Sequence, residues 1–208
     1  MKPVILIGGG GHAKVLAATL IEQKIPILGF TDPDPEKATL LGLPRLGTDD
    51  IILTHPPDTI QLAQGLGSIR PGPLRAKVFD HFKSLGYTFV TAIHPTATVA
   101  PDVEIGEGTV IFAGTIIQPG TTIGENCILN TRCSVDHDCH IGPHNHIAPG
   151  ATLSGTITTG PHCHIGTGAT LIQGLTLGES THIGAGAVLL RNTPPHTTHL
   201  GNPARIIP

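Results

Sequence analysis

The sequence predicts two successive folds, a small α/β unit with a Rossmann-like parallel sheet over residues 1–92 and a parallel β-helix over residues 93–208. Alternating apolar runs predict the first fold, and an uninterrupted six-residue repeat predicts the second. The composition agrees with a turn-dense chain, because it holds 27 glycines and 19 prolines while aromatic residues make up only 3%.

The α/β unit is predicted from apolar runs that alternate with helical patterns. Residues 4–7 read as a buried strand, four glycines follow, and the apolar spacing from Val15 to Ile21 indicates a helix. Residues 25–30 read as a second strand, which ends at a Thr-Asp-Pro-Asp-Pro turn. The other expected elements are strands at residues 51–53, 60–63 and 87–92 and a helix at residues 74–85. Strands separated by helices predict a parallel sheet.

The β-helix is predicted from every sixth residue after position 93. These residues are Ile93, Val99, Ile105, Ile111, Ile117, Ile123, Leu129, Val135, Ile141, Ile147, Leu153, Thr159, Ile165, Leu171, Leu177, Ile183 and Leu189. Sixteen of the seventeen are aliphatic, Thr159 is the exception, and no insertion breaks the spacing. The residues four positions later are mostly small. Large and small inward side chains on short strands joined by tight turns account for this pattern.

All four cysteines, Cys127, Cys133, Cys139 and Cys163, occupy the small inward position of the repeat. We therefore expect free thiols that pack as small apolar residues, in preference to disulfides or a zinc site.

Charge and hydropathy exclude two classes of partner. All six lysines precede residue 84, and only three arginines follow residue 93, so the chain has no basic stripe for nucleic acid. The apolar run near the N-terminus is too short for a signal peptide or a membrane helix. We expect a soluble, cytoplasmic protein that does not insert into a membrane.

The densest polar segment of the repeat covers residues 130–146 and contains adjacent His137 and Asp138. His137 comes two residues after Val135, where a turn is expected. A carboxylate beside an imidazole can fix its tautomer and stabilise its cation, as a general base requires. A surface histidine beside an aspartate is also common without any catalytic role, so the local chemistry leaves both readings open.

The chain resembles the bacterial nucleotide-sugar and sialic acid acetyltransferases, which are hexapeptide-repeat enzymes. The resemblance spans nearly the whole sequence, from Gly-Gly-Gly-Gly-His-Ala-Lys-Val at residues 8–15 to Gly-Asn-Pro-Ala-Arg at residues 201–205. It implies a left-handed β-helix with three six-residue repeats per coil, a nucleotide-sugar-binding N-terminal domain, acetyl-CoA as co-substrate and a homotrimer with active sites between subunits. A trimer would also cover outward-facing aliphatic residues on the flat faces.

The same resemblance implies roles for individual residues. His137 falls on the general base, Asp138 on the acid that orients it, and Asn130 on a polar residue of the site. His146 falls on a histidine near the acetyl group, and Gly155 on the residue whose N–H contacts the thioester carbonyl. The closing loop, with Gly201, Asn202, Pro203 and Arg205, is implied to lie close to bound CoA.

Three repeats per coil would stack histidines that are 18 residues apart. His146, His164 and His182 would form one outward ladder, and His144 and His162 a second one. We expect these ladders to face solvent or a neighbouring subunit. The alternative is a metal site between subunits, as in β-helical carbonic anhydrases. That family has two ligand histidines five residues apart, this sequence has no such pair, and we therefore expect no metal.

The glycines at residues 8–11 precede a helix and match a loose dinucleotide-binding pattern, with Asp32 at the end of the next strand. About 90 residues cannot supply both a complete dinucleotide fold and a catalytic domain, and a β-helix has no hydride chemistry, so a redox cofactor is disfavoured. The resemblance implies nucleotide-sugar contacts at Gly10, Gly11, His12, Asp32 and Arg70. Residues 65–68 read Gly-Leu-Gly-Ser where the family commonly has Gly-Asn or Gly-Asp, so uridine, guanosine and cytidine all remain open.

The expected function is N-acetylation of a nucleotide-linked 4-amino-4,6-dideoxy sugar for surface glycan synthesis. Two alternatives stay open. One is O-acetylation of a sialic acid or another sugar hydroxyl, and the other is a non-catalytic sugar-nucleotide-binding protein.

Overall fold

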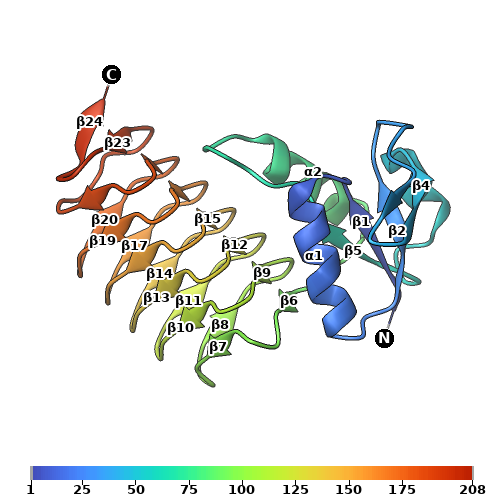
Figure 1. The fold of residues 1–208 in the computed structure, drawn as a ribbon, viewed down its shortest axis with the longest axis horizontal. Helices are drawn as coiled ribbons and strands as arrows, with labels where there is room; N and C mark the ends of the chain where they lie inside the picture. The colour runs from blue at the N-terminus through green and yellow to red at the C-terminus, as the bar shows by residue number, and fades with distance from the viewer. Residues whose placement is uncertain (1, 208) are drawn as a thin grey trace.

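The computed structural model describes residues 2–207 and consists of an α/β part followed by a long β-helix (Figure 1). The α/β part has a five-stranded sheet in the order β3-β4-β2-β1-β5, parallel except for the β3–β4 pair. Its elements are β1 (Val4–Ile7), α1 (Gly11–Glu22), β2 (Ile27–Thr31), β3 (Thr39–Leu40), β4 (Leu43–Gly47), a 3₁₀ helix (Asp49–Thr54), β5 (Gln61–Gln64) and α2 (Leu74–Ser84).

Two predicted strands of the α/β part are wrong. Residues 51–53 lie in the 3₁₀ helix. The Tyr87 hydroxyl contacts the end of this helix, where it lies 2.9 Å from the Ile52 carbonyl oxygen and 2.8 Å from that of His55. Residues 87–92 form only a single bridge between Phe89 and Leu62 before β6 begins. The short hairpin of β3 and β4 was not predicted.

The β-helix is confirmed as a left-handed parallel β-helix, and its chain visits three flat faces in turn. We call them the cleft face, the second face and the third face. The cleft face holds β6 (Ala92–Ile93), β9 (Val110–Ile111), β12 (Ile128–Leu129), β15 (His146–Ile147), β18 (His164–Ile165), β21 (His182–Ile183), β23 (Thr198–Leu200) and β24 (Arg205–Ile207). The second face holds β7 (Thr98–Val99), β10 (Ile116–Ile117), β13 (Ser134–Val135), β16 (Thr152–Leu153), β19 (Thr170–Leu171) and β22 (Val188–Leu189). The third face holds β8 (Glu104–Ile105), β11 (Thr122–Ile123), β14 (His140–Ile141), β17 (Thr158–Thr159) and β20 (Thr176–Leu177).

The core of the β-helix is the column of aliphatic and small residues that the repeat predicts. All four cysteines are buried there as free thiols, as predicted. The exception in the repeat, Thr159, is also buried, and its hydroxyl oxygen accepts hydrogen bonds from the Asn145 side-chain amide and the Gly142 N–H. Two inward polar residues on successive coils therefore satisfy each other, which removes most of the cost of burying them.

Each coil turns at the third residue after the aliphatic position, where the backbone is left-handed. Glycine occupies many of these turns, but Asp138, His144 and His162 adopt the same conformation with φ values of 57°, 60° and 61°. Aspartate tolerates this region because its side chain can bond locally. The turn thus places the Asp138 carboxylate beside the ring of His137.

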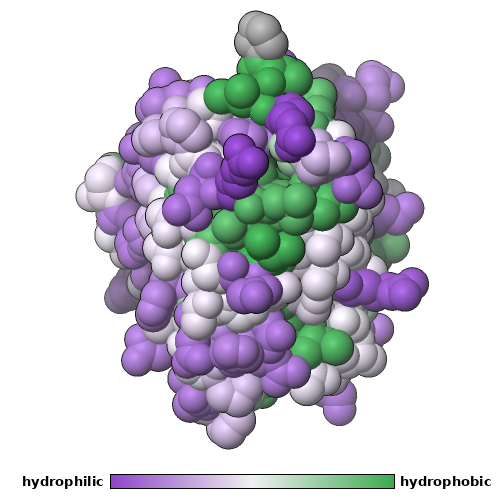
Figure 2. Space-filling model, turned by 90° about the vertical axis from the view of Figure 1, so that its left-hand side faces the viewer, coloured by the Kyte–Doolittle hydropathy of each residue, from purple (hydrophilic) through white to green (hydrophobic). Residues whose placement is uncertain are grey.

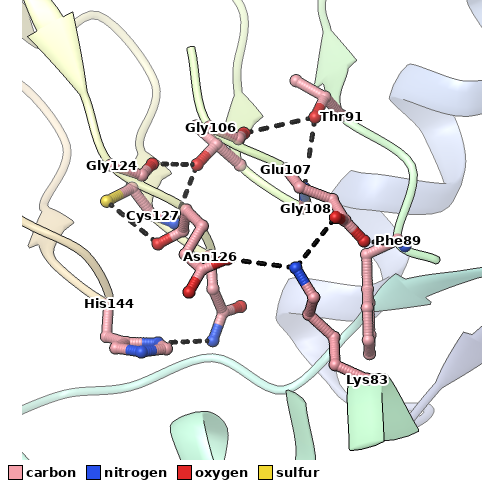
Figure 3. Close-up of polar contacts among 12 residues, drawn as sticks. Lys83, Phe89, Thr91, Gly106, Glu107, Gly108, Gly124, Asn126, Cys127 and His144 are labelled. Carbon is pink, nitrogen blue, oxygen red and sulfur yellow. Dashed lines mark hydrogen bonds and ion pairs between the residues drawn. The ribbon is translucent and has the colours of Figure 1, made fainter. Parts of the chain in front are cut away.

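The α/β part packs against the first coils of the cleft face. The outward residues Ala92, Val110 and Ile128 are buried in the same cluster as the apolar side of α1, so the α/β part covers these aliphatic residues. Polar contacts reinforce the junction (Figure 3), where the Lys83 ammonium lies 2.9 Å from a Glu107 carboxylate oxygen and 3.2 Å from one of Glu125. Ile206 and Ile207 of β24 are among the large apolar residues that stay exposed. Figure 2 shows that apolar residues gather on the side of the molecule where the β-helix ends. No helix within residues 2–207 has the length and hydropathy to cross a membrane.

Candidate active site

A cleft of about 910 Å³ lies between the α/β part and the cleft face of the β-helix. Its walls are the glycine turn at residues 8–11, the loop at residues 65–69, and side chains of β12, β15, β18 and β21. Among residues 2–207, Asp32 and Lys37 are the only acidic or basic residues of the lining apart from histidines. The loop extends from β5 toward the β-helix (Figure 1), so residues far apart in the sequence line one site.

The glycine turn presents a helix N-terminus to this cleft. Gly10 is the N-cap of α1, no side chain caps the helix, and its first turn contains no acidic residue. A Cβ atom at Gly10 or Gly11 would meet nothing within 4 Å, so the space in front of both residues is open. Free backbone N–H groups at a helix N-terminus favour an anion such as a phosphate.

Asp32 organises this turn from beneath. Its carboxylate accepts hydrogen bonds from the Gly9 N–H at 2.8 Å, the Asp34 N–H at 3.0 Å and the Lys37 ammonium at 3.0 Å. Burial on its own would raise the pKa of Asp32, but these hydrogen bonds and the charge of Lys37 lower it below its ordinary value. Asp32 is therefore an ionised residue of the cleft, and Lys37 is a cation that the sequence analysis did not single out.

His146 lines the cleft and is held in one tautomer. Its Nδ1 lies 2.9 Å from the Ser68 carbonyl oxygen, which can only accept, so Nδ1 carries the proton. Its Nε2 then accepts from the Asn130 side-chain amide at 3.1 Å. Burial first, and then the neighbouring charge of His164, lowers the pKa of His146 to about 3. The structure thus brings together His146 and Asn130, both predicted, with Ser68, which was not.

The histidine ladder is real, but its predicted exposure is wrong. The His146 and His164 rings lie 4.8 Å apart and the His164 and His182 rings 5.3 Å apart, each pair edge to face. His146 is only 7% exposed and His164 only 6%, because the loop of residues 65–69 and the α/β part cover them. His12 faces the same cleft from α1 and packs edge to face on Phe112. Within residues 2–207 no group of three or more His, Cys, Asp or Glu side chains is arranged to hold a metal ion.

These buried histidines predict that acid destabilises the fold. Burial lowers the pKa of His12 and His146 to about 3 and that of His164 to about 4. Below pH 6.5 these histidines are therefore protonated in the unfolded chain but stay neutral in the folded chain. The folded state loses stability as the pH falls from 6.5 toward the lowered pKa values. At pH 5.5 each of these three histidines lowers the free energy of unfolding by about 1.4 kcal/mol, so together they lower it by roughly 4 kcal/mol. Thermal unfolding at pH 7.5 and 5.5 measures this loss.

The matched variants are His164→Gln, which removes one buried imidazole, and His81→Gln, which removes an exposed one. We expect the His164→Gln variant to lose the contribution of one buried histidine, about 1.4 kcal/mol at pH 5.5, and the control variant to lose much less. Equal pH dependence in wild type and His164→Gln would contradict buried, neutral histidines as its source.

His137 lies elsewhere, at the corner between the second and third faces. The residue is exposed, and its Nδ1 lies 2.8 Å from an Asp138 carboxylate oxygen. Since an ionised carboxylate only accepts, Nδ1 donates and Nε2 is left free as a proton acceptor. The hydrogen bond from His137 to Asp138, and then the charges of Asp136 and Asp138, raise the pKa of His137 above its ordinary value.

Gly155 lies one coil above His137 at the same corner. A Cβ atom on Gly155 would come within 2.6 Å of both Cε1 and Nε2 of His137, so the free side of the imidazole rests on the Gly155 backbone. No hydrogen bond among residues 2–207 uses the Gly155 N–H. A reacting carbonyl group at this corner could therefore meet a proton acceptor and a backbone donor together.

The other predicted residues lie outside the cleft lining. Arg70 is exposed, in the loop that follows Ser68. Gly201, Asn202, Pro203 and Arg205 are exposed at the C-terminal end of the β-helix, where the Gly201 carbonyl oxygen accepts from the Val188 N–H. Their roles stay predictions.

Within one chain, the cleft and the pair of His137 and Asp138 lie apart. The cleft opens on the cleft face, whereas His137 lies at the corner between the other two faces, which points away from it. Neither His137 nor Gly155 lines the cleft.

Comparison with known proteins places the chain in a family. Residues 3–82 match the family model described as the PglD N-terminal domain, and residues 120–155 match that of the bacterial transferase hexapeptide (six repeats). A search of curated proteins found no match. Among solved structures, the acetyltransferase domain of PglB from Neisseria gonorrhoeae is 34% identical with a TM-score of 0.94, and the match covers 100% of both chains.

Two further structures are similar over their whole length. PerB from Caulobacter crescentus, in complex with CoA and GDP-perosamine, is 35% identical with a TM-score of 0.92, covering 100% of this chain and 98% of that one. WeeI from Acinetobacter baumannii is 28% identical with a TM-score of 0.89, covering 100% of both. The chain therefore belongs to the hexapeptide-repeat nucleotide-sugar acetyltransferases, a family of acyltransferases.

Proposed function

We propose that the protein transfers the acetyl group of acetyl-CoA to the amine of a nucleotide-linked 4-amino-4,6-dideoxy sugar, as a step in surface glycan synthesis. The observation that carries this proposal is the cleft, which combines an open helix N-terminus for a diphosphate with a neutral, oriented His146. The full-length similarity to PerB, whose structure contains CoA and GDP-perosamine, supports the same substrate classes.

The proposed reaction is a direct transfer. The sugar amine attacks the thioester carbonyl carbon, and His137 Nε2 removes the proton that the nitrogen must lose. The Gly155 N–H stabilises the oxyanion of the tetrahedral intermediate. The C–S bond then breaks, and the His137 cation protonates the departing thiolate of CoA. Asp138 holds the imidazole with Nε2 toward the reacting atoms and stabilises its cation. Solved structures of a perosamine N-acetyltransferase from Caulobacter crescentus include variants in which one histidine is replaced by asparagine or alanine, and this interest in a histidine of a relative supports the choice of a histidine as the base.

The proposed active site needs two copies of the chain. His137 faces away from the cleft of its own chain, so the amine of a sugar held in one cleft would be served by His137 of another subunit. A homotrimer closes such a head-to-tail arrangement with three equivalent sites. We further propose that the closing loop with Gly201 and Asn202 contacts CoA, while Arg70 contacts the nucleotide.

Thiol release from acetyl-CoA tests the function directly. The acceptors are UDP-, GDP- and CMP-linked 4-amino sugars, their 4-hydroxy counterparts, and free sialic acid. We expect release only with an amino sugar, and the preferred nucleotide identifies the base. Release with a hydroxyl acceptor alone would indicate an O-acetyltransferase. Binding of nucleotide sugar without binding of acetyl-CoA, measured by calorimetry, would indicate a non-catalytic protein.

The Asp138→Asn variant tests whether Asp138 raises the pKa of His137. In wild type, kcat/KM should rise with pH and level off above the raised pKa of His137, because only neutral imidazole accepts a proton. Loss of the carboxylate lowers that pKa, so the acid limb should move to lower pH while the plateau rate falls. The pH–rate profile of both proteins measures this, and an unmoved limb would contradict the pairing of His137 with Asp138. Asp102→Asn, at another turn, is the matched control and should leave the limb in place.

A further inference from the structure

A second, smaller cavity lies behind the loop that walls the cleft. Its volume is about 20 Å³, enough for one or two species the size of water. It shares Ser68 and His164 with the cleft. The lining residues are Ser68, Arg70, Pro71, Gly72, Arg75, Ala76, His144, His162, Cys163 and His164. None of them is acidic, and five are arginine or histidine.

Arg75 is a buried cation that has no carboxylate partner among residues 2–207. It lies in the first turn of α2 and is only 7% exposed. Its Nη1 donates to the Asn126 carbonyl oxygen at 3.0 Å and to the Asn126 side-chain oxygen. Its Nε and Nη2 are buried and have no hydrogen-bond acceptor among residues 2–207. Burial lowers the pKa of Arg75 to about 9, so the guanidinium remains charged at neutral pH. A buried charge without a counter-charge is strongly unfavourable.

The orientation of the Asn126 side chain determines the tautomer of His144. Because the Asn126 side-chain oxygen accepts from Arg75, its amide nitrogen faces Nδ1 of His144 and donates to it at 3.0 Å (Figure 3). Burial, then the charge of His162, lowers the pKa of His144, so its ring is neutral and carries its proton on Nε2. His144 therefore contributes a donor rather than an acceptor.

Two further features of the cavity favour an anion. Nδ1 of His164 is buried and has no partner among residues 2–207. The cavity also lies at the N-terminus of α2, an eleven-residue helix without a side-chain cap. The charges of Asp80 and Glu125 reach His144, but neither residue lines the cavity, and Glu125 pairs with Lys83.

We propose that this cavity binds one monatomic anion, chloride in the cell, as the counter-ion of Arg75. A lining of donors with net positive charge suits an anion, and the volume excludes a phosphate or a sugar carboxylate. A water molecule could satisfy the free N–H groups but would leave the charge of Arg75 uncompensated. The anion would also hold the loop in place, because Ser68 separates this cavity from the cleft and bonds His146.

Bromide is the probe for the site, because its anomalous X-ray scattering distinguishes it from water. Crystals of the full-length protein grown in sodium bromide should show an anomalous peak within hydrogen-bond distance of Arg75 Nε or Nη2. Ordered water there without an anomalous signal would overturn the proposal. This measurement uses the wild-type protein, so it does not depend on the folding of any variant or on acetyl transfer.

Thermal unfolding gives the matched test in solution, with sodium chloride or bromide compared with sodium gluconate at equal ionic strength. We expect halide to raise Tm by about 4 °C or more at concentrations well above Kd. Arg75→Met should abolish the difference, whereas Arg191→Met, at an exposed arginine, should preserve it. A halide effect of equal size in Arg75→Met would show adventitious binding elsewhere and would refute the assignment.

Discussion

Replacing His137 by alanine is expected to lower kcat for acetyl transfer by at least about 10²-fold, because general base catalysis typically contributes ~10²–10⁴-fold. Binding of acetyl-CoA and of nucleotide sugar should change little, since His137 is exposed and holds no part of the core. Steady-state kinetics with calorimetric binding of both substrates separates these effects.

His140→Ala is the matched control for this variant. His140 lies on β14 at the third face, three residues after His137, and is also exposed. We expect its replacement to leave kcat within a factor of about two, as for most exposed positions away from a site. A His137→Ala protein with more than a tenth of the wild-type kcat would contradict the proposed base.

Replacing Gly10 by aspartate should abolish nucleotide-sugar binding without harming the fold. A Cβ atom at this position would meet nothing within 4 Å, and aspartate is a favoured N-cap residue, so the stability of α1 should be kept or raised. The new carboxylate would face a bound diphosphate. Two like charges 4 Å apart repel by about 4 kcal/mol at an effective dielectric constant near 20, so Kd should rise at least ~10²-fold.

Gly10→Asn is the matched control, because it has nearly the same shape as aspartate and caps the helix without a charge. We expect Asn to weaken binding much less than Asp. Calorimetric titration with nucleotide sugar and thermal unfolding measure both properties. Equal binding by the Asp variant and wild type would show that the diphosphate does not lie at the N-terminus of α1.

The β-helix could be predicted in detail because its repeat is local. Each coil presents the same inward pair of a large and a small side chain, so the register, the core and the free cysteines all follow from spacing. Residues 51–53 show the limit of such reasoning. A short apolar run is compatible with strand or helix, and here a contact from Tyr87, more than thirty residues away, accompanies the 3₁₀ helix.

Candidate site residues could be named from the sequence, and the structure brings His146 and Asn130 together, but the surroundings of these residues could not be predicted. The loop at residues 65–69 has no periodic pattern, and its contact with His146 joins positions 78 residues apart. Its burial of the histidine ladder was therefore missed, as were Ser68 and Lys37. The only sequence signal for Lys37 was its place in the charged turn after β2, which many surface lysines share.

Mixing the His137→Ala and Gly10→Asp variants tests the proposed shared active site most directly. In a randomly assembled trimer of His137→Ala and Gly10→Asp chains, a site works only when His137 comes from the Gly10→Asp subunit and the cleft from the His137→Ala subunit. Co-expressed or jointly refolded proteins should therefore recover about a quarter of the wild-type activity per site, although each variant alone is inactive. Assembly with no activity above that of the separate variants would contradict a site built from two subunits.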